Sequence, residues 1–303
     1  MNRLPNNLIS YGPRANCTLD LCPIKASVYQ YRPSLPANVI LLVLFFLLGL
    51  AHLYRGIRHP SHFFTLSMLL GCLSEVLGYT GRLLLWSNPF SFPGFMIQIC
   101  LVTFAPVFFC AAIYVLLSRI VVHLDVSLSR FDPRLWYWIF IPADVISLAL
   151  QGAGGGMSSS SVGTDSAGVD ISLAGLSFQV VTLAFFSAAS MDYALRYVAR
   201  HGTGGLDRRF RVFVVALATA VVLIFVRCAY RIEELREGYR SSLISNQGLF
   251  IALEGVVVVL AVVALLVAHP GPVFEGRRGE GEKVRVVVVG GSSDEETGMK
   301  GEA

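Results

Sequence analysis

Seven apolar runs constrain this chain more than any other feature of its sequence. Each run approaches the roughly 20 residues that an α-helix needs to cross a bilayer. Only 15% of the residues are charged, whereas a soluble domain carries about 25%. The sequence therefore predicts an all-α, polytopic membrane helix bundle with seven transmembrane helices. The predicted spans are Leu35–Tyr54, Phe63–Leu85, Gly94–Ser118, Leu135–Gln151, Ile171–Tyr193, Phe210–Tyr230 and Gly248–Ala268.

Basic residues are distributed unevenly among the loops that join these runs. The first, third and fifth loops hold Arg55, Arg58, Arg119, Arg130, Arg134, Arg196, Arg200, Arg208 and Arg209. Segments 86–93 and 152–170 contain no Lys or Arg, although the sixth loop departs from the alternation with Arg231, Arg236 and Arg240. Short loops rich in Lys and Arg stay in the cytoplasm. We therefore expect the N-terminus outside and the C-terminus in the cytoplasm.

Polar segments flank the predicted membrane domain at 35–271. Residues 1–34 are expected to form an extracytoplasmic segment, and residues 272–303, with a valine run at 284–289, a disordered cytoplasmic tail. Asn16-Cys17-Thr18 is an N-glycosylation acceptor, usable only on the lumenal side. Cys17 and Cys22 could form a disulfide in that compartment. The Gly/Ser-rich segment 152–170 is typical of a flexible connector.

Ionisable and amide side chains within the apolar runs predict a polar interior, because such groups are costly in lipid and face the bundle. Glu75 and Arg82 lie seven residues apart on one helical face, so they could form an ion pair, act in function, or both. Asp144 has no cation on its own run, so it must be neutralised from another span or protonated. The further candidates are Tyr114, Gln151, Gln179, Arg227, Arg231, Glu234 and Glu254.

Helix packing and interface effects account for some of the same residues. Gly71 and Gly78 would let a neighbouring helix approach the Glu75 face closely. Pro106 would kink the third span, and Gln98 and Gln179 are expected to make interhelical hydrogen bonds. The stripe of Arg227, Arg231 and Glu234 fits either an interfacial cluster whose side chains reach toward water or a functional site.

Several classes of enzyme and ligand are excluded by missing motifs. The chain contains no HExxH helix, no GxSxG elbow and no Walker-type loop. His52, His59 and His62 cluster near the first loop, but the repeated histidine boxes of a di-iron enzyme are missing. No lysine lies in the apolar body, which excludes a retinal-type Schiff base. We therefore expect no enzyme activity, no cofactor or metal, and no nucleic-acid partner.

Seven motifs in order carry a resemblance to a known family. They are YRPSLPAN before the first span, SEVLGYTGR, APVFFCAAIYVLLSR, DVISLALQGAGGG, GLSFQ and RCAYRIEELREG in the second to sixth spans, and HPG after the seventh. In these motifs the chain resembles the fungal lipid-translocating exporter (RTA-like) family of seven-span membrane proteins. The resemblance covers roughly residues 31–272. It departs after Glu254, where GVVVVLAVVALL replaces the polar and aromatic residues expected by the resemblance.

The resemblance implies a plasma-membrane protein that exports or translocates sphingoid long-chain bases or sterol-like toxic compounds and so confers resistance. It adds Tyr79 and Pro106 to the site candidates. In this hypothesis a cationic amine meets Asp144 or Glu254 while the lipid chain lies against apolar helix faces. The alternatives are a seven-span receptor or sensor and an indirect regulator of membrane lipid asymmetry. A receptor is disfavoured because the third run ends in LSRIVVH without an Asp-Arg-Tyr triplet and the seventh lacks Asn-Pro-x-x-Tyr.

Overall fold

The structure, a computed structural model, describes residues 3–4, 8–130, 132–160, 166–202, 207–236 and 246–271. The tail predicted at 272–303, with its valine run, and the predicted loop residue Arg240 lie outside the described residues.

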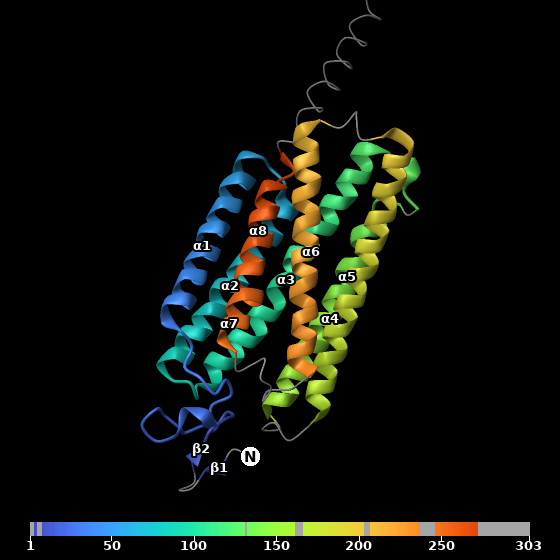
Figure 1. The fold of residues 1–303 in the computed structure, drawn as a ribbon. Coiled ribbons are helices and arrows are strands. Elements are labelled where there is room, and N and C mark those ends of the chain that lie inside the picture. The colour runs from blue at the N-terminus through green and yellow to red at the C-terminus, as the bar shows by residue number, and fades with distance from the viewer. Residues whose placement is uncertain are drawn as a thin grey trace, which may run out of the picture.

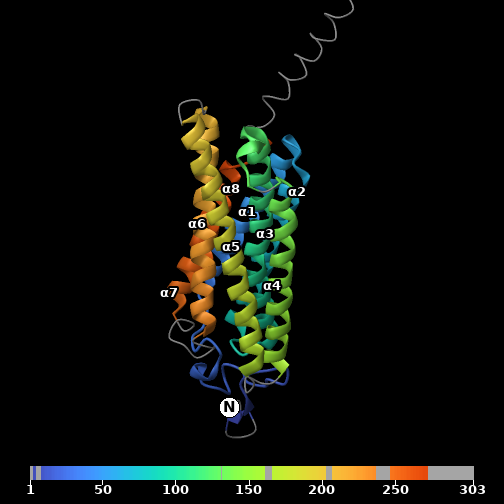
Figure 2. The same cartoon turned by 90° about the vertical axis from the view of Figure 1, so that its right-hand side faces the viewer.

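Seven long helical segments form one bundle within the described part of the chain (Figures 1 and 2). All are long and apolar enough to cross a membrane, as predicted. The first six are α1 (Leu35–Arg58), α2 (His62–Ser87), α3 (Phe92–Leu124), α4 (Leu135–Ser160), α5 (Ser166–His201) and α6 (Arg208–Arg236). The seventh is continuous through α7 (Gln247–Leu249), the π-helical turn η4 (Phe250–Val256) and α8 (Val257–Val267).

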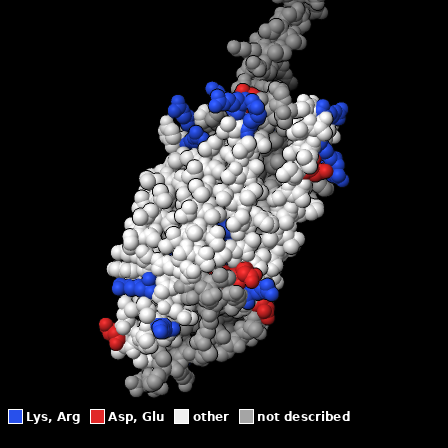
Figure 3. Space-filling model, in the orientation of Figure 1, with Lys and Arg blue, Asp and Glu red and all other residues white. Residues whose placement is uncertain are grey.

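The helices extend beyond most of the apolar runs, because only their middle portions need to be apolar. At 1.5 Å per residue, the 24 residues of α1 span about 36 Å, which exceeds the roughly 30 Å of a hydrocarbon core. Exposed arginines such as Arg58, Arg200 and Arg208 occupy the ends of helices, where water can reach them. In Figure 3 a broad band with almost no charged side chains separates the charged ends of the molecule.

Helix α3 lies at the centre of the bundle, in contact with α2, α4 and α6. Of its most apolar stretch, 56% is buried, compared with 22% for α1, which turns most of its surface outward. The pair α2–α3 packs closely because small residues face the partner, as predicted for Gly78. A methyl group there would lie 2.5 Å from Val102 Cγ2, and one on Gly81 would lie 2.7 Å from the Gln98 backbone nitrogen.

The described parts of the Gly/Ser-rich segment, residues 152–160 and 166–170, are helical and not the flexible connector that we predicted, while residues 161–165 lie outside the described residues. Residues 152–160 continue α4, and residues 166–170 begin α5. The glycines serve helix contact: a methyl group on Gly154 would lie 2.5 Å from the carbonyl oxygen of Gly168, and one on Gly175 would lie 2.9 Å from that of Ser147. The high Gly and Ser content suggested a linker. It could not show that these glycines face one another across two antiparallel helices.

The N-terminal segment covers one end of the bundle, at the bottom of Figure 1, opposite the end of α8. It contains the short antiparallel strands β1 (Arg3–Leu4) and β2 (Leu8–Ile9) and the 3-10 turn η2 (Ile24–Ala26). Cys17 and Cys22 are joined by a disulfide. The opposite end includes a second 3-10 turn, η3 (Val126–Leu128), after α3. Because the number of long helical segments is odd, the N-terminal segment and the end of α8 lie at opposite ends of the bundle.

Candidate functional site

Buried ion pairs join Arg227 and Arg231 of α6 to Glu254 in the π-helical turn η4, and Arg231 also pairs with Glu234 within α6. Arg227 Nη2 lies 2.7 Å from Glu254 Oε2, with both side chains at most 1% exposed. Arg231 Nη1 lies 2.5 Å from Glu234 Oε2 and 3.9 Å from Glu254 Oε1. The interfacial reading of this stripe is therefore wrong, because the side chains point into the bundle, where opposite charges compensate their burial. We call these four residues the ionic cluster.

Pro106 explains why α3 accepts one of these arginines. A proline has no backbone N–H, so the carbonyl four residues earlier, at Val102, loses its helical donor. Arg227 Nη2 donates to this carbonyl oxygen at 2.8 Å. One turn of α3 is thus completed by a side chain from α6. Thr103, next along α3, accepts from Arg231 Nη2 at 3.2 Å.

Glu254 lies in a helical turn with π-type hydrogen bonding. Such turns are rare in proteins overall, but many of them occur at functional sites. The neighbouring Gly255 faces α1 and α2: a methyl group there would lie 2.6 Å from Leu41 Cδ1 and 3.3 Å from Tyr79 Oη. The Tyr79 ring stacks on Phe45. These contacts position Glu254 in the interior, with 0% of its side chain exposed.

Glu75 and Arg82 do not form the ion pair that their spacing allowed. Arg82 Nε donates to Asn38 Oδ1 at 2.9 Å, and its Nη2 donates to Tyr31 Oη at 3.0 Å. Its guanidinium carbon lies 3.8 Å from the centre of the Phe250 ring, in cation–π range. Through these contacts Arg82, on α2, binds α1, η4 and the N-terminal segment.

Glu75 is completely buried, and neither carboxyl oxygen has a hydrogen-bond partner among the described residues. It lies within electrostatic range of Arg227 and Glu254. The internal charges are thus only partly paired. Arg227, Arg231, Glu234 and Glu254 form ion pairs with one another, while Glu75, Asp144 and Arg82 form none within the described part of the chain.

Asp144, on α4, is 1% exposed, and its side chain faces α3. Tyr114 Oη, two turns beyond Pro106, donates to Asp144 Oδ2 at 2.9 Å. The other oxygen, Oδ1, has no partner among the described residues. The rings of Phe140 and Phe186 pack against Tyr114, at centroid distances of 5.4 and 4.5 Å. Asp144 is therefore enclosed by an aromatic cluster.

A second polar chain joins α4 to α5. Gln151 Nε2 donates to Gln179 Oε1 at 3.0 Å and to Ser147 Oγ at 2.8 Å. Ser147 Oγ in turn donates to the Gly175 carbonyl oxygen at 2.7 Å. The interhelical bond predicted for Gln179 is confirmed. Gln98 instead accepts from Tyr29 Oη of the N-terminal segment at 2.7 Å, so its predicted interhelical role is wrong.

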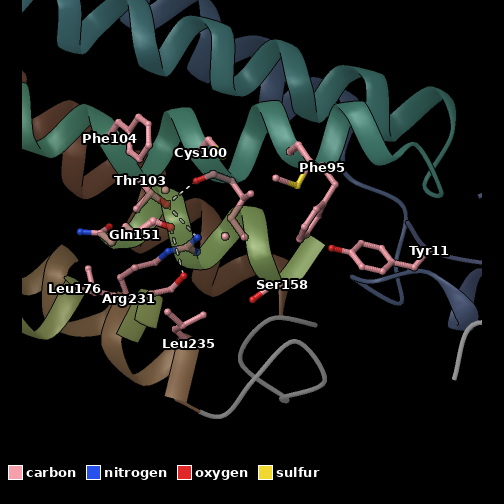
Figure 4. Close-up of a pocket in the computed structure, with 15 residues that line it drawn as sticks. Tyr11, Phe95, Cys100, Thr103, Phe104, Gln151, Ser158, Leu176, Arg231 and Leu235 are labelled. Atoms are coloured by element: carbon pink, nitrogen blue, oxygen red, sulfur yellow. Dashed lines mark hydrogen bonds between the residues drawn. The ribbon is translucent and has the colours of Figure 1, made fainter. Parts of the chain in front are cut away.

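An open groove brings the ionic cluster and this polar chain to a common surface (Figure 4). It lies among α3, α4, α5 and α6 beside the N-terminal segment and has a volume of about 560 Å³, including the part open to the outside. Apolar residues line much of it, and Arg231, Gln151 and Thr103 bring polar groups to its wall. The other lining residues are Tyr11, Phe95, Met96, Ile99, Cys100, Phe104, Gly152, Gly155, Ser158, Ser172, Leu176 and Leu235.

The structure brings the predicted residues together unevenly. Gln151 and Arg231 reach the groove, whereas Asp144 and Glu254, our two candidates to hold a substrate amine, do not line it. Sequence reasoning missed Asn38, Tyr31 and Thr103. Thr103 carried one usable signal, since it lies three residues before the proline that opens the α3 hydrogen-bond ladder.

The histidines at the opposite end form no metal site in the described ranges, where no group of three suitable ligands occurs. His52 Nε2 lies 3.3 Å from the Val262 carbonyl oxygen, and the His269 ring packs edge-on against Phe64. Burial lowers the pKa of His269, which follows the last span, to about 4, and the nearby His52 and Arg55 contribute in the same direction.

Comparison with known proteins gives one family and several relatives. The family described as RTA1 like protein matches residues 68–277. Sphingoid long-chain base transporter RSB1 from Saccharomyces cerevisiae is 28% identical over 285 residues, which cover 81% of this chain and 74% of the relative. Protoporphyrin uptake protein 1 from the same species is 31% identical over 219 residues, covering 71% and 72%. Protein RTM1 is 29% identical over 206 residues, covering 66% and 65%. No solved structure matches the chain.

Proposed function

The chain belongs to the RTA1-like protein family, and from that premise we propose that it moves an amphipathic lipid or a toxic lipid-like compound across the membrane. The resemblance drawn from the seven sequence motifs is thereby confirmed, and the chain is an integral membrane protein with seven candidate spans. The proposed substrate class is a sphingoid long-chain base or a sterol-like compound, and the proposed outcome is resistance to such compounds.

The open groove is the observation that carries this proposal. An amphipath needs an apolar surface for its chain and a polar surface for its head, and small-molecule sites combine both in one concavity. Phe95, Ile99 and Leu176 supply apolar surface, while Gln151 and Arg231 lie on the same wall. The groove is open to the outside of the bundle, and we propose that a lipid enters it from the bilayer.

The chemistry of the polar wall accommodates heads of either charge. Arg231, which lines the groove, would meet a carboxylate or another anionic head. Glu234 does not line the groove but pairs with Arg231 at 2.5 Å, and it would meet an amine once that ion pair opens. Hydroxyl groups would bond to Gln151, Thr103 and Ser172. This range suits a family with relatives named for a sphingoid base and for protoporphyrin.

We place the N-terminus outside, the C-terminus in the cytoplasm and the protein in the plasma membrane. The end of the bundle that bears Arg58, Arg200 and Arg208 would then face the cytoplasm. The Cys17–Cys22 disulfide and the exposed Asn16 would lie in the oxidising, glycosylating compartment.

Two adjacent glycines offer a matched test of the groove. Gly155 lines it and Gly156 does not, and a methyl group at either would meet no atom within 4 Å. We expect Gly155→Leu to fill the groove and to slow transport at least about tenfold, which corresponds to about 1.4 kcal/mol. Gly156→Leu should transport at the wild-type rate. Both variants should fold, because leucine favours helix over glycine.

The assay uses purified protein in lipid vesicles and a radiolabelled sphingoid long-chain base, with labelled protoporphyrin as a second probe. Equal rates for Gly155→Leu and wild type would refute the assignment of the groove. If wild-type protein moved neither probe, an indirect regulator or a sensor would replace the proposed transporter.

A further inference from the structure

Asp144 is a buried acid that forms no ion pair within the described part of the chain and does not line the groove. Its single partner is Tyr114 Oη, and Oδ1 has none among the described residues. An isolated carboxylate in an apolar interior is strongly disfavoured relative to the neutral acid. By contrast, Glu254 and Glu234 are compensated by arginines at 2.7 and 2.5 Å. Glu75 also lies near Arg227.

None of the described titratable groups that face Asp144 is a cation. From α3 come Tyr114 and the thiol of Cys110, and from α6 the thiol of Cys228. The stretch 171–191 of α5 contains no titratable residue. No arginine within the described part of the chain comes within ion-pairing distance of Asp144. A proton is the simplest cation that can neutralise this side chain.

A polar face of α4 leads from Asp144 to the groove. Asp144, Ser147, Gln151 and Ser158 follow the helical spacing of three, four and seven residues, so they share one face. Gln151 and Ser158 line the groove. Gln151, about 10 Å along the axis from Asp144, is bonded to Ser147 at 2.8 Å.

Gln151 also connects groove occupancy to this face. Its amide nitrogen already donates to Ser147 and Gln179. An amide NH₂ group has two donor hydrogens, so a head group that accepts from Gln151 must displace one of these bonds. Such a head group would therefore change the hydrogen bonding at Ser147, which lies one turn from Asp144, or at Gln179.

We propose that Asp144 is a proton-binding site reached from the groove, and that loading and release of its proton are coupled to substrate movement. The coupling rests on the proposed function, whereas proton binding does not. One proton is exchanged or carried per substrate; no bond other than O–H forms or breaks, and the proton gradient supplies the energy. The sequence contains no Walker-type loop, so we propose that a proton gradient and not nucleotide hydrolysis supplies the energy for transport.

The transport test uses wild-type protein in vesicles, a one-unit pH difference and a clamped membrane potential. The probe is an N-trimethylated sphingoid base, whose charge does not change with pH. For one proton per substrate we expect about tenfold accumulation of the probe, because one pH unit is equivalent to about 1.4 kcal/mol. Accumulation on the acidic side indicates exchange, and accumulation on the alkaline side indicates co-transport.

Asp144→Asn should abolish accumulation, since asparagine keeps an oxygen that can accept from Tyr114 but cannot release a proton. Asp192→Asn is the matched control, because Asp192 is 39% exposed and pairs with Arg130 at the far end of the bundle. Accumulation in Asp144→Asn equal to that in wild type would overturn the coupling.

Infrared difference spectroscopy tests proton binding without a substrate. We expect a protonated-carboxyl C=O band that titrates with pH in wild type, shifts in frequency in Tyr114→Phe and disappears in Asp144→Asn. If the band is unaffected by Asp144→Asn, the proton site is refuted. If the band behaves as expected but wild type moves no probe, the proposed transport fails while the proton site stands.

Discussion

Replacing Arg227 by methionine tests how far the ionic cluster stabilises the bundle. Methionine retains much of the apolar bulk but removes the partner of Glu254 at 2.7 Å and the donor to the Val102 carbonyl oxygen at 2.8 Å. Leaving one member of a buried ion pair alone costs about 3–5 kcal/mol. A buried carbonyl without a donor costs about 1–3 kcal/mol. Arg231, 3.9 Å from Glu254, offsets part of this loss.

We therefore expect Arg227→Met to lower the free energy of unfolding by about 4 kcal/mol. The double variant Arg227→Met/Glu254→Met should recover more than half of that loss, because a well-packed apolar pair replaces the charges. In a Pro106→Ala background the cost of Arg227→Met should fall by about 1 kcal/mol, since alanine restores an N–H donor for Val102.

The assay is reversible unfolding in mixed micelles, followed by far-ultraviolet circular dichroism. Arg58→Met, at an exposed arginine, is the control and should change the free energy by less than about 0.5 kcal/mol. A loss below about 1 kcal/mol for Arg227→Met, or a double variant no more stable than the single one, would contradict the reasoning.

Two further predictions concern helix packing and orientation. Gly81→Ala should destabilise the bundle by about 1–3 kcal/mol in the same unfolding assay, because its methyl group would lie 2.7 Å from the Gln98 backbone nitrogen. The control is Gly155→Ala, whose methyl group meets no atom within 4 Å, and it should be neutral or stabilising by up to about 1 kcal/mol. Equal effects of the two substitutions would disprove the packing argument. Wild-type protein made in a glycosylating cell should lose apparent mass on glycosidase treatment. The Asn16→Gln variant should not, since the sequence has no other acceptor tripeptide. A wild-type protein whose mass does not change on glycosidase treatment would count against an extracytoplasmic N-terminus.

The identity of the polar residues was predictable, but their partners were not. Glu75, Asp144 and Glu254 stand out because a charge within an apolar run is costly in lipid unless it faces the protein interior. Spacing on one helix suggested that Glu75 pairs with Arg82, yet Arg82 bonds to Asn38 and Tyr31. Helical periodicity shows which residues share a face, whereas a pairing across helices depends on depth, rotation and neighbour.

The number of candidate spans and the presence of a polar interior were predictable from the order of the residues alone. Both follow from local properties, namely the length of each apolar run and the cost of placing a charge within it. Three features became visible only in the folded bundle: Arg227 completes the turn opened by Pro106, the glycines after Gln151 belong to packed helices, and Asp144 lies apart from the groove. Each of these depends on contacts between different helices. The side-chain pattern of one helix does not specify which face of another it meets.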